Sequence, residues 1–262
     1  MKKNVLISGA GTGLGRAASI ALARNGHRVF ATTFDEMQAE ELKHFAASNA
    51  LELESFKLDV TSEQDREQIR DIEIDVLINN AGIGYSGSIA EVDVELVREN
   101  FEVNVFAGIE LTQLALKGMI ARRRGSVIFI SSIVGRMSVP FLGPYCMTKH
   151  AIEAAAEALR AEMDVLGANI QVALIEPGPY YTGFNQQIMG NKFSWMSQES
   201  YFYDQLDSLK AQDEDTLKEL ETTDLGTIVE KIVAAAEAKR PDLRYFAPEW
   251  LLRIVKDHEA EK

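Results

Sequence analysis

Short, continuously apolar runs alternate with longer helix-patterned segments from the start of the chain to about residue 175. Runs that are apolar at every position, rather than at every second one, are typical of parallel strands covered on both faces. Helices between such strands imply right-handed crossovers. The alternation therefore predicts an α/β fold, a Rossmann-type, doubly wound, mostly parallel seven-stranded sheet with helices on both faces.

A length of 262 residues suits a single domain of this kind, so we expect one α/β domain over residues 1–262. The segment at about 180–224 departs from the rhythm, with many aromatic and polar residues and no clear strand. Ligands of such sheets bind at the carboxyl ends of the strands, so an insertion there is predicted to act as a substrate lid. The expected strands are 4–8, 28–33, 52–58, 76–79, 126–131, 169–175 and, more weakly, 243–246; the expected helices are 13–25, 35–48, 62–71, 93–124 and 145–166.

The charge balance excludes several classes of partner. The formal net charge is −13, which argues against a general attraction to nucleic acid or anionic lipid. Cys146 is the sole cysteine, so an internal disulfide is impossible, as expected in a reducing cytoplasm. The scattered histidines predict no metal site, and no apolar stretch has the length of a membrane span. We expect a cytoplasmic protein with a small-molecule substrate, and with Cys146 as a small packing residue.

A glycine-rich turn follows the first apolar run and opens the first predicted helix. It contains Gly9, Thr12, Gly13, Leu14 and Gly15 in the pattern G-x-x-x-G-x-G. Glycines permit a tight turn here and let backbone N–H groups approach a pyrophosphate at the helix N-terminus. No Gly-Lys-Ser/Thr follows, so the turn is not a P-loop. The turn predicts dinucleotide binding, the alternative being a merely tight strand-to-helix connection.

Tyr145 and Lys149 stand four positions apart at the head of a predicted helix and therefore share one helix face. An ammonium beside a phenol favours the phenolate, so we expect a pKa of Tyr145 below the usual value of about 10. A phenol tuned in this way can give or take a proton at a carbonyl or alcohol oxygen. Ser132 precedes Tyr145 in a register that argues against a purely structural buried tyrosine.

Several further motifs lie in register with these residues. Asn79-Asn80-Ala81-Gly82 follows the fourth strand, and Pro177-Gly178 with Thr182 follows the sixth. With the glycine turn, they make the chain resemble the short-chain dehydrogenase/reductase family, in its compact single-domain branch. The resemblance covers nearly everything up to Thr182. The family's catalytic four are matched in order and spacing by Asn104, Ser132, Tyr145 and Lys149.

The resemblance implies an NAD(P)-dependent oxidoreductase that transfers a hydride between a nicotinamide and a ketone or secondary alcohol. Ser132 would hold the substrate oxygen, Tyr145 would act as general acid/base, Lys149 would hold the ribose, and Asn104 would fix a water. The cofactor-binding residues it implies are Gly9, Thr12, Gly13, Leu14, Gly15, Thr33, Asp59, Val60, Asn80, Ala81, Gly82, Tyr145, Lys149, Pro177, Gly178 and Thr182. The alternative is a non-catalytic dinucleotide-binding sensor or scaffold, although such relatives usually lose the Tyr or the Lys.

The choice between NADP and NAD depends on the end of the second strand. Thr33 falls where NAD enzymes of the family carry Asp, and Phe34 where many NADP enzymes carry Arg. With no acid to repel a 2′-phosphate, and with Thr33 able to donate to it, NADP is slightly favoured. Asp35 comes two positions late and is expected to cap the next helix, and Arg16 is the nearby base.

Apolar and aromatic side chains gather after residue 140 and predict a non-anionic, fairly apolar ketone or secondary alcohol as substrate. Packing of the same residues against the body is an equal alternative; they are Phe141, Leu142, Tyr180, Tyr181, Phe184, Met189, Phe193, Trp195 and Met196. The long predicted helices 93–124 and 145–166 resemble those through which family members associate. We therefore expect a homodimer or homotetramer.

Overall fold

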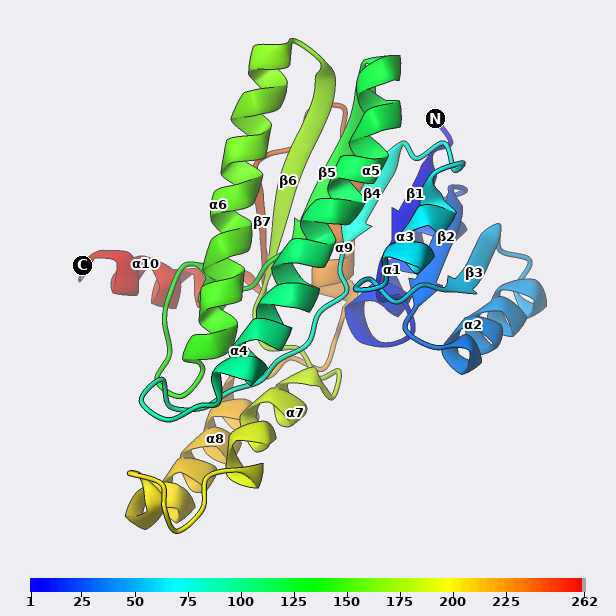
Figure 1. Ribbon diagram of the computed structural model, residues 1–262. Helices are drawn as coiled ribbons and strands as arrows, with labels where there is room; N and C mark the ends of the chain where they lie inside the picture. Colours follow the sequence, from blue (N-terminus) through cyan, green and yellow to red (C-terminus); the bar gives the residue numbers. More distant parts are fainter. Residues whose placement is uncertain (261–262) are drawn as a thin grey trace.

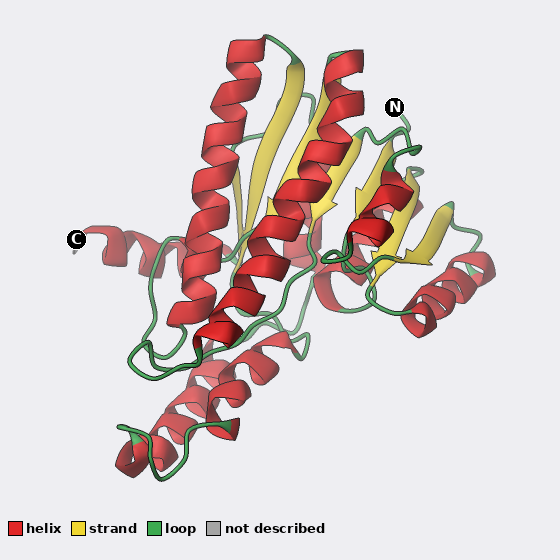
Figure 2. Cartoon of the chain, viewed as in Figure 1, coloured by secondary structure: helices red, strands yellow, loops and turns green. Residues whose placement is uncertain are grey.

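The computed structural model describes residues 1–260, so residues 261–262 of the expected domain lie outside the described residues. The strands form one seven-stranded sheet in the order β3-β2-β1-β4-β5-β6-β7, and every neighbouring pair is parallel (Figures 1 and 2). The predicted doubly wound α/β fold is confirmed. The strands are β1 Asn4–Ile7, β2 Arg28–Thr33, β3 Leu53–Lys57, β4 Val76–Asn79, β5 Arg124–Ile130, β6 Asn169–Pro177 and β7 Arg244–Ala247.

Helices cover both faces of the sheet, with α5 and α6 against one face and α1 and α9 against the other. Local signals explain where several of them begin: Asp35 caps α2 by accepting from Gln38 N at 2.8 Å, as expected, and Asp93 caps α4. The helices are α1 Gly13–Arg24, α2 Glu36–Ser48, α3 Glu63–Arg66, α4 Val94–Phe101, α5 Ala107–Arg122, α6 Gly143–Leu166, α7 Phe184–Asn191, α8 Leu206–Leu220, α9 Gly226–Glu237 and α10 Leu252–Ala260.

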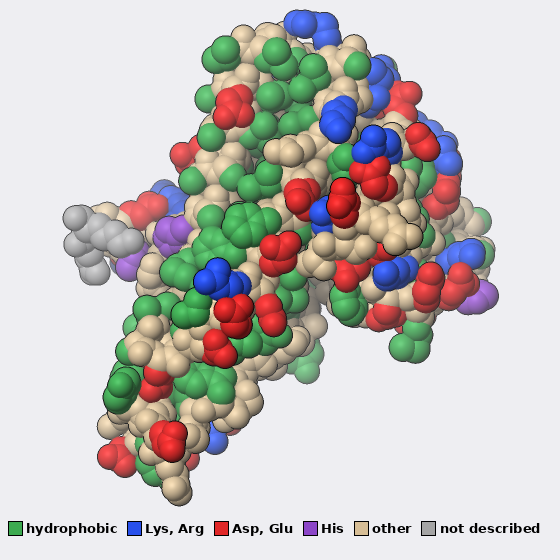
Figure 3. All heavy atoms as spheres, viewed as in Figure 1, with side chains coloured by type: hydrophobic (Ala, Val, Ile, Leu, Met, Phe, Trp, Pro, Cys, Tyr) green, Lys and Arg blue, Asp and Glu red, His purple; other side chains and the backbone are tan. Residues whose placement is uncertain are grey.

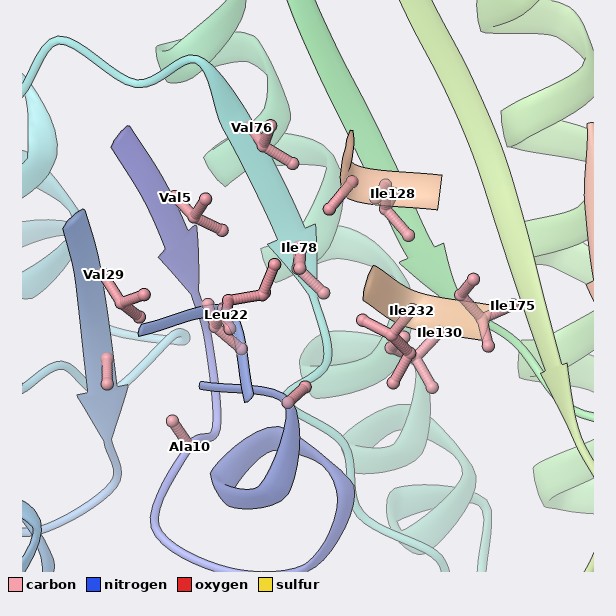
Figure 4. Packing of buried hydrophobic residues seen from close by; sticks show 14 of the residues in the cluster. Val5, Ala10, Leu22, Val29, Val76, Ile78, Ile128, Ile130, Ile175 and Ile232 are labelled. Atoms are coloured by element: carbon pink, nitrogen blue, oxygen red, sulfur yellow. The ribbon is translucent and has the colours of Figure 1, made fainter. Parts of the chain in front are cut away.

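Successive residues of the central strands enter two separate cores, which is why most of their positions are apolar. Val5 and Ile7 of β1 pack with Leu22 of α1 and Ile232 of α9 on one face (Figure 4). Leu6, between them, belongs to the core under α5 and α6. The sheet is thus buried on both sides, and its carboxyl edge is left for ligands.

Two predicted helices differ from the structure. The segment expected as one helix over 93–124 is α4, then a π-helical turn Glu102–Phe106, then α5, and Arg124 already belongs to β5. Apolar periodicity does not reveal a shift from i−4 to i−5 backbone hydrogen bonds, so the interruption was missed. The expected helix 62–71 is only α3 followed by a 3₁₀ turn, Glu67–Ile69, because this tighter turn carries Ile69 into the core.

The segment 180–224 projects from the carboxyl edge of the sheet as an arm of short helices (Figure 1). It holds α7, the 3₁₀ turns Lys192–Ser194 and Tyr203–Gln205, and α8. Its two ends lie side by side, because Tyr181 N donates to Thr222 O and Thr222 N donates to Pro179 O, each at 2.9 Å. In residues 1–260, none of the helices combines the length and apolarity that crossing a bilayer requires.

Candidate active site

A cleft of about 1030 Å³ opens at the carboxyl edge of the sheet. The loops that follow β1, β4, β5 and β6 form its floor, and α7, α8 and the start of α10 form its outer wall. In doubly wound sheets this edge is where ligands bind. Most residues predicted for cofactor and catalysis line this cleft: Gly9, Thr12, Gly13, Leu14, Asp59, Val60, Asn80, Ala81, Gly82, Ser132, Tyr145, Lys149, Pro177, Gly178 and Thr182.

The glycine turn is tied to the loop after β4. Ser8 Oγ accepts from Asn80 N and Ala81 N at 3.0 and 3.1 Å, and Asn80 Nδ2 donates to the carbonyls of Ser8 and Gly9 at 2.9 Å. Gly9 has a φ of +67°, and a Cβ there would lie 2.7 Å from Ala81 Cα. Only glycine fits at this position, since both the conformation and the close approach exclude a side chain.

The start of α1 suits a diphosphate. Thr12 occupies its N-cap, and within residues 1–260 its side chain makes no capping hydrogen bond. The first backbone N–H groups of α1 therefore face the cleft beside Gly13 without a side-chain acceptor, which is the arrangement that binds phosphate at helix N-termini. These residues fit the pyrophosphate of a dinucleotide.

Two predicted cofactor residues lie away from the cleft. Thr33 is fully buried, and its hydroxyl donates to the carbonyl of Asp35 at 2.8 Å. The expectation that this hydroxyl donates to a 2′-phosphate is therefore corrected. Gly15 instead allows close packing, because a Cβ there would lie 2.5 Å from the Gly9 carbonyl oxygen. Phe34 and Gln38, which the sequence did not single out as ligand contacts, line the cleft at the end of β2.

Tyr145 and Lys149 lie in the first turns of α6 and are 7% and 6% exposed. Lys149 Nζ donates to the carbonyl of Ile130, at the end of β5, at 2.8 Å. It also lies 5.4 Å from the centre of the Tyr145 ring. The Phe184 ring of α7 meets the Tyr145 ring edge-on at 5.8 Å. The phenol and the ammonium thus share the face of α6 that borders the cleft, as their spacing predicted.

Burial dominates the electrostatics of this pair. It raises the pKa of the Tyr145 phenol above its ordinary value, with a smaller contribution from Cys146, and it lowers the pKa of Lys149 to about 8. The predicted lowering of the Tyr145 pKa is therefore wrong for this structure. Burial removes the water that would stabilise the phenolate, and this raises the pKa. The Lys149 ammonium lies over the ring and does not offset that loss.

Asn104 lies in the π-helical turn and joins the loop after β4 to the catalytic helix. Its Oδ1 accepts from Ile83 N at 2.8 Å, and its Nδ2 donates to Ile83 O at 2.9 Å and to Thr148 Oγ1 at 3.2 Å. A cavity of about 10 Å³ lies behind it, lined also by Lys149 and Ile130. This is about the smallest volume that admits one water molecule.

Ser132 follows β5 and is partly exposed to the cleft. Its Oγ donates to the carbonyl of Pro177 and accepts from Val134 N, both at 3.4 Å. These contacts are long, so a substrate oxygen can replace the serine's weak bond to Pro177. Ser132 therefore links the end of β5 to the end of β6, and its hydroxyl lies in the lining of the cleft.

The outer half of the cleft is apolar, and much of this lining was not predicted. Of the residues proposed from the sequence, Leu142, Tyr180, Phe184 and Met189 line it. Among the others, Phe141 packs against Phe202 and the Trp195 ring against Gly87, whereas Tyr181 is exposed. The unpredicted residues lie far apart in the sequence, and no local pattern marks them: Met137, Val139, Ile188, Leu217, Leu220, Leu251 and Ile254.

Known proteins share this fold and these motifs. Residues 3–192 match the family described as short chain dehydrogenase. The chain is 36% identical over 209 residues to the "Uncharacterized oxidoreductase YusZ" of Bacillus subtilis, covering 77% of this chain and 74% of that protein. It is 33% identical over 264 residues to the "NADPH-dependent 3-dehydrocapnine reductase" of Ornithobacterium rhinotracheale, covering 94% and 89%.

The fold also matches a solved structure, a short chain dehydrogenase/reductase from Burkholderia phymatum in complex with NAD. The TM-score is 0.82 at 20% identity, over 100% of this chain and 95% of that one. This chain belongs to the short chain dehydrogenase family. It is an NAD(P)-dependent oxidoreductase that acts on a small molecule.

Proposed function

We propose that this enzyme interconverts a ketone and a secondary alcohol, with Tyr145 as the general acid/base. The observation that carries the proposal is the meeting of the Tyr145 phenol, the Lys149 ammonium and the Ser132 hydroxyl in the lining of one cleft. When bound, the dinucleotide supplies or accepts the hydride at its nicotinamide ring. Ser132 donates to the substrate oxygen and holds it for proton transfer.

Tyr145 donates its phenolic proton to that oxygen in the reductive direction and takes it back in the oxidative direction. The raised pKa keeps the phenol neutral near pH 7, which is the form that donates. Lys149 stabilises the phenolate left after donation, because its ammonium lies over the ring. Asn104 fixes a water in the small cavity behind Lys149, through which the proton is replaced.

NADP is the cofactor we propose, on the composition of the cleft at the end of β2. The side chains that line it there are the neutral Phe34 and Gln38, while Asp35 caps α2 through its Oδ1. A carboxylate at this point would repel a 2′-phosphate. A fluorescence titration with NADPH and NADH tests this, and tighter binding of NADH would contradict it.

The substrate we propose is an uncharged ketone or alcohol with an apolar chain. Many apolar side chains line the cleft, Leu217 and Leu220 of α8 among them, and the α7 residues Asn185 and Gln187 beside them are neutral. Burying a carboxylate among them would be costly. The relative named as a 3-dehydrocapnine reductase supports the reductive direction.

The test compares 2-alkanones with chains of the same length that end in a carboxylate. We expect kcat/KM to favour the uncharged member by about tenfold or more. Leu217→Gln should raise KM for the longer ketones, whereas Leu209→Gln on the same helix, outside the cleft lining, should not. A preference for the keto acids contradicts the proposal.

We also propose a cytoplasmic homodimer or homotetramer built from one catalytic domain, with the segment 180–224 as a lid. Support for self-association comes from the face formed by α5 and α6, over which hydrophobic side chains gather (Figure 3). Ile120, Met147, Val165 and Leu166 are 38%, 41%, 90% and 47% exposed there. Sedimentation equilibrium tests the assembly, and a monomer at micromolar concentration would contradict it.

A further inference from the structure

Charged side chains form a cluster directly behind the catalytic residues, and the mechanism above does not use it. Its inner members are Glu153 of α6 and Glu176 of β6, whose side chains are 8% and 0% exposed. Its outer members are Arg244 of β7 and Arg136 after β5, 30% and 23% exposed. Burying a carboxylate is costly even when a charged partner binds it, so the presence of two buried carboxylates beside the active site calls for a functional explanation.

The two arginines hold the two buried carboxylates from opposite sides. Arg244 Nη2 lies 3.0 Å from Glu153 Oε2, and its Nε lies 2.9 Å from Glu176 Oε1. Arg136 Nη1 donates to Glu176 Oε2 at 3.2 Å. The exposed Glu157 and Glu259 complete the outer sides of Arg244 and Arg136. The cluster therefore joins α6, β6, β7 and the turn after β5.

Glu153 lies against two parts of the active site. It follows Lys149 by one helical turn, so Tyr145, Lys149 and Glu153 share one face of α6. It also supports the turn that begins at Ser132, because a Cβ on Gly135 would lie 3.0 Å from Glu153 Cγ and 3.2 Å from the Lys149 carbonyl. The Glu153 side chain thus contacts the turn through its Cγ and carries a charge one helical turn from Lys149.

The charge of Glu153 opposes the effect of burial on Lys149. The pKa of Lys149 is lowered to about 8 because burial outweighs the opposing effect of the Glu153 carboxylate, which raises it. Glu153 Oε1 is buried and has no hydrogen-bond partner within residues 1–260, although Arg244 binds the other oxygen. A carboxylate only half-satisfied by hydrogen bonds keeps a strong field toward a neighbouring ammonium in a low-dielectric site.

We propose that Glu153 is a positioning residue of the active site, whose carboxylate keeps the Lys149 ammonium charged and supports the Ser132 turn. The role rests on the function proposed above. The charged groups around Glu153 are Lys149 on α6, Arg244 on β7 and Glu176 on β6. More distant charges bear on it indirectly: Glu157 pairs with Arg244, and Glu259 pairs with Arg136, which binds Glu176. Tyr145 is linked to Glu153 through Lys149. Without the carboxylate, Lys149 would lose its proton at lower pH.

The experiment is competitive acetylation of Lys149 by trace acetic anhydride in the full chain without dinucleotide, followed by mass spectrometry. Only the neutral amine reacts, so the pH profile of labelling reports the pKa of Lys149. For Glu153→Gln we expect labelling at about pH 6.5 to be roughly five- to tenfold faster than in the wild type, as a lost charge contact of this kind implies. Glu153→Asp, which keeps the charge, should return the profile toward the wild type.

Two further variants separate this role from simple stabilisation. Glu157→Gln also removes a partner of Arg244, but from the exposed side, so its labelling profile should match the wild type. Arg244→Gln removes the positive charge beside Glu153 and should slow the labelling of Lys149, a change of opposite sign. If Glu153→Gln does not fold, the labelling profile of Arg244→Gln tests the proposal in its place.

An unchanged labelling profile in a folded Glu153→Gln variant overturns the proposal, as does faster labelling in Arg244→Gln. Turnover is read separately, from the pH dependence of kcat/KM. If the wild type turns over no ketone, the proposed function fails while the labelling result still stands. If the wild type turns over but Glu153→Gln labels as the wild type does, only the role of Glu153 fails.

Discussion

The helices α6 and α8 both border the cleft, yet they are held in opposite ways. Of the 24 residues of α6, nine are buried, and they include Tyr145, Lys149 and Glu153. Of the 15 residues of α8, none is buried. The first helix is thus fixed by the core, whereas the second presents Leu217 and Leu220 to the cleft.

This difference separates two tasks. In the proposed function, proton transfer requires a fixed geometry, since small displacements of reacting groups are costly, and the deeply packed α6 suits this. The proposed apolar substrate would require a surface that can adjust, and the low burial of α8 suits that. Variants on the two sides should therefore differ in kind: on the α6 side they should change kcat, pH dependence and stability, and on the α8 side mainly KM.

The largest effect is expected from Tyr145→Phe. Removing the phenolic oxygen removes the proposed proton donor, so kcat should fall by about 10²- to 10⁴-fold. The ring and its contact with Phe184 remain, and binding of NADPH should stay within about twofold of the wild type. Steady-state kinetics and a fluorescence titration measure both. Turnover within tenfold of the wild type would remove Tyr145 from the mechanism.

Glu176→Gln should change how stability depends on pH. Burial and the neighbouring Glu153 raise the pKa of Glu176 to about 7, from a model-peptide value of 4.5. The folded state therefore binds more protons than the unfolded state between these values, and the unfolding free energy contributed by this group falls as pH rises through that window. Above it, the loss amounts to about 3 kcal/mol at most.

Urea unfolding of both proteins at several pH values tests this. The wild-type stability minus that of Glu176→Gln should decline from about pH 4.5 to pH 7 and then level off. A difference that grows with pH would mean that the arginines outweigh burial at this carboxyl.

Asn104→Ala tests the difference between the body and the segment 180–224 through the unfolding free energy. The change leaves the partly buried N–H and C=O of Ile83 without their partner, which should lower the unfolding free energy by about 2 kcal/mol. Asn191→Ala is the matched change in the segment 180–224, where the side-chain amide donates to Gly84 O at 2.7 Å, and it should cost about 1 kcal/mol or less. Equal losses in denaturant titrations would argue that this segment and the body are equally fixed.

The smallest effect is expected from Glu91→Gln. The Glu91 carboxylate accepts from Ser200 Oγ at 2.6 Å and from Tyr201 N at 3.0 Å, and so holds the segment 180–224 against the body. Weakening these contacts should raise KM for an apolar ketone about two- to fivefold, with kcat unchanged. Glu95→Gln, on the exposed surface of α4, is the control. A fall in kcat alone would contradict a role in substrate enclosure.

The sequence predicted the parts of this molecule that depend on local pattern. Continuous apolar runs predicted the strands, and the four-residue spacing predicted that Tyr145 and Lys149 share a helix face. Asp35 was expected to cap α2, and it does. In each instance the determining residues lie within a few positions of one another, so periodicity or spacing is sufficient.

The rest depended on distant contacts. The π-helical turn around Asn104 is a shift of backbone hydrogen bonds that the side-chain pattern does not record. Thr33 was expected at the cofactor, but the bend after β2 turns its hydroxyl to Asp35. Glu153, Glu176 and Arg244 meet only when α6, β6 and β7 are assembled. The pKa of Tyr145 was expected on the wrong side of its usual value because spacing does not report lost hydration.

The paired backbone at Tyr180 and Thr222 has a consequence for engineering. The chain leaves the body and returns to it at one point, where main-chain hydrogen bonds hold the two ends together. The residues of α8, none of which is buried, can therefore be exchanged while this backbone pairing holds the two ends of the segment. Grafting the equivalent helix of another enzyme is thus a direct route to new selectivity, provided that Thr182 and Phe184 in the cleft are kept.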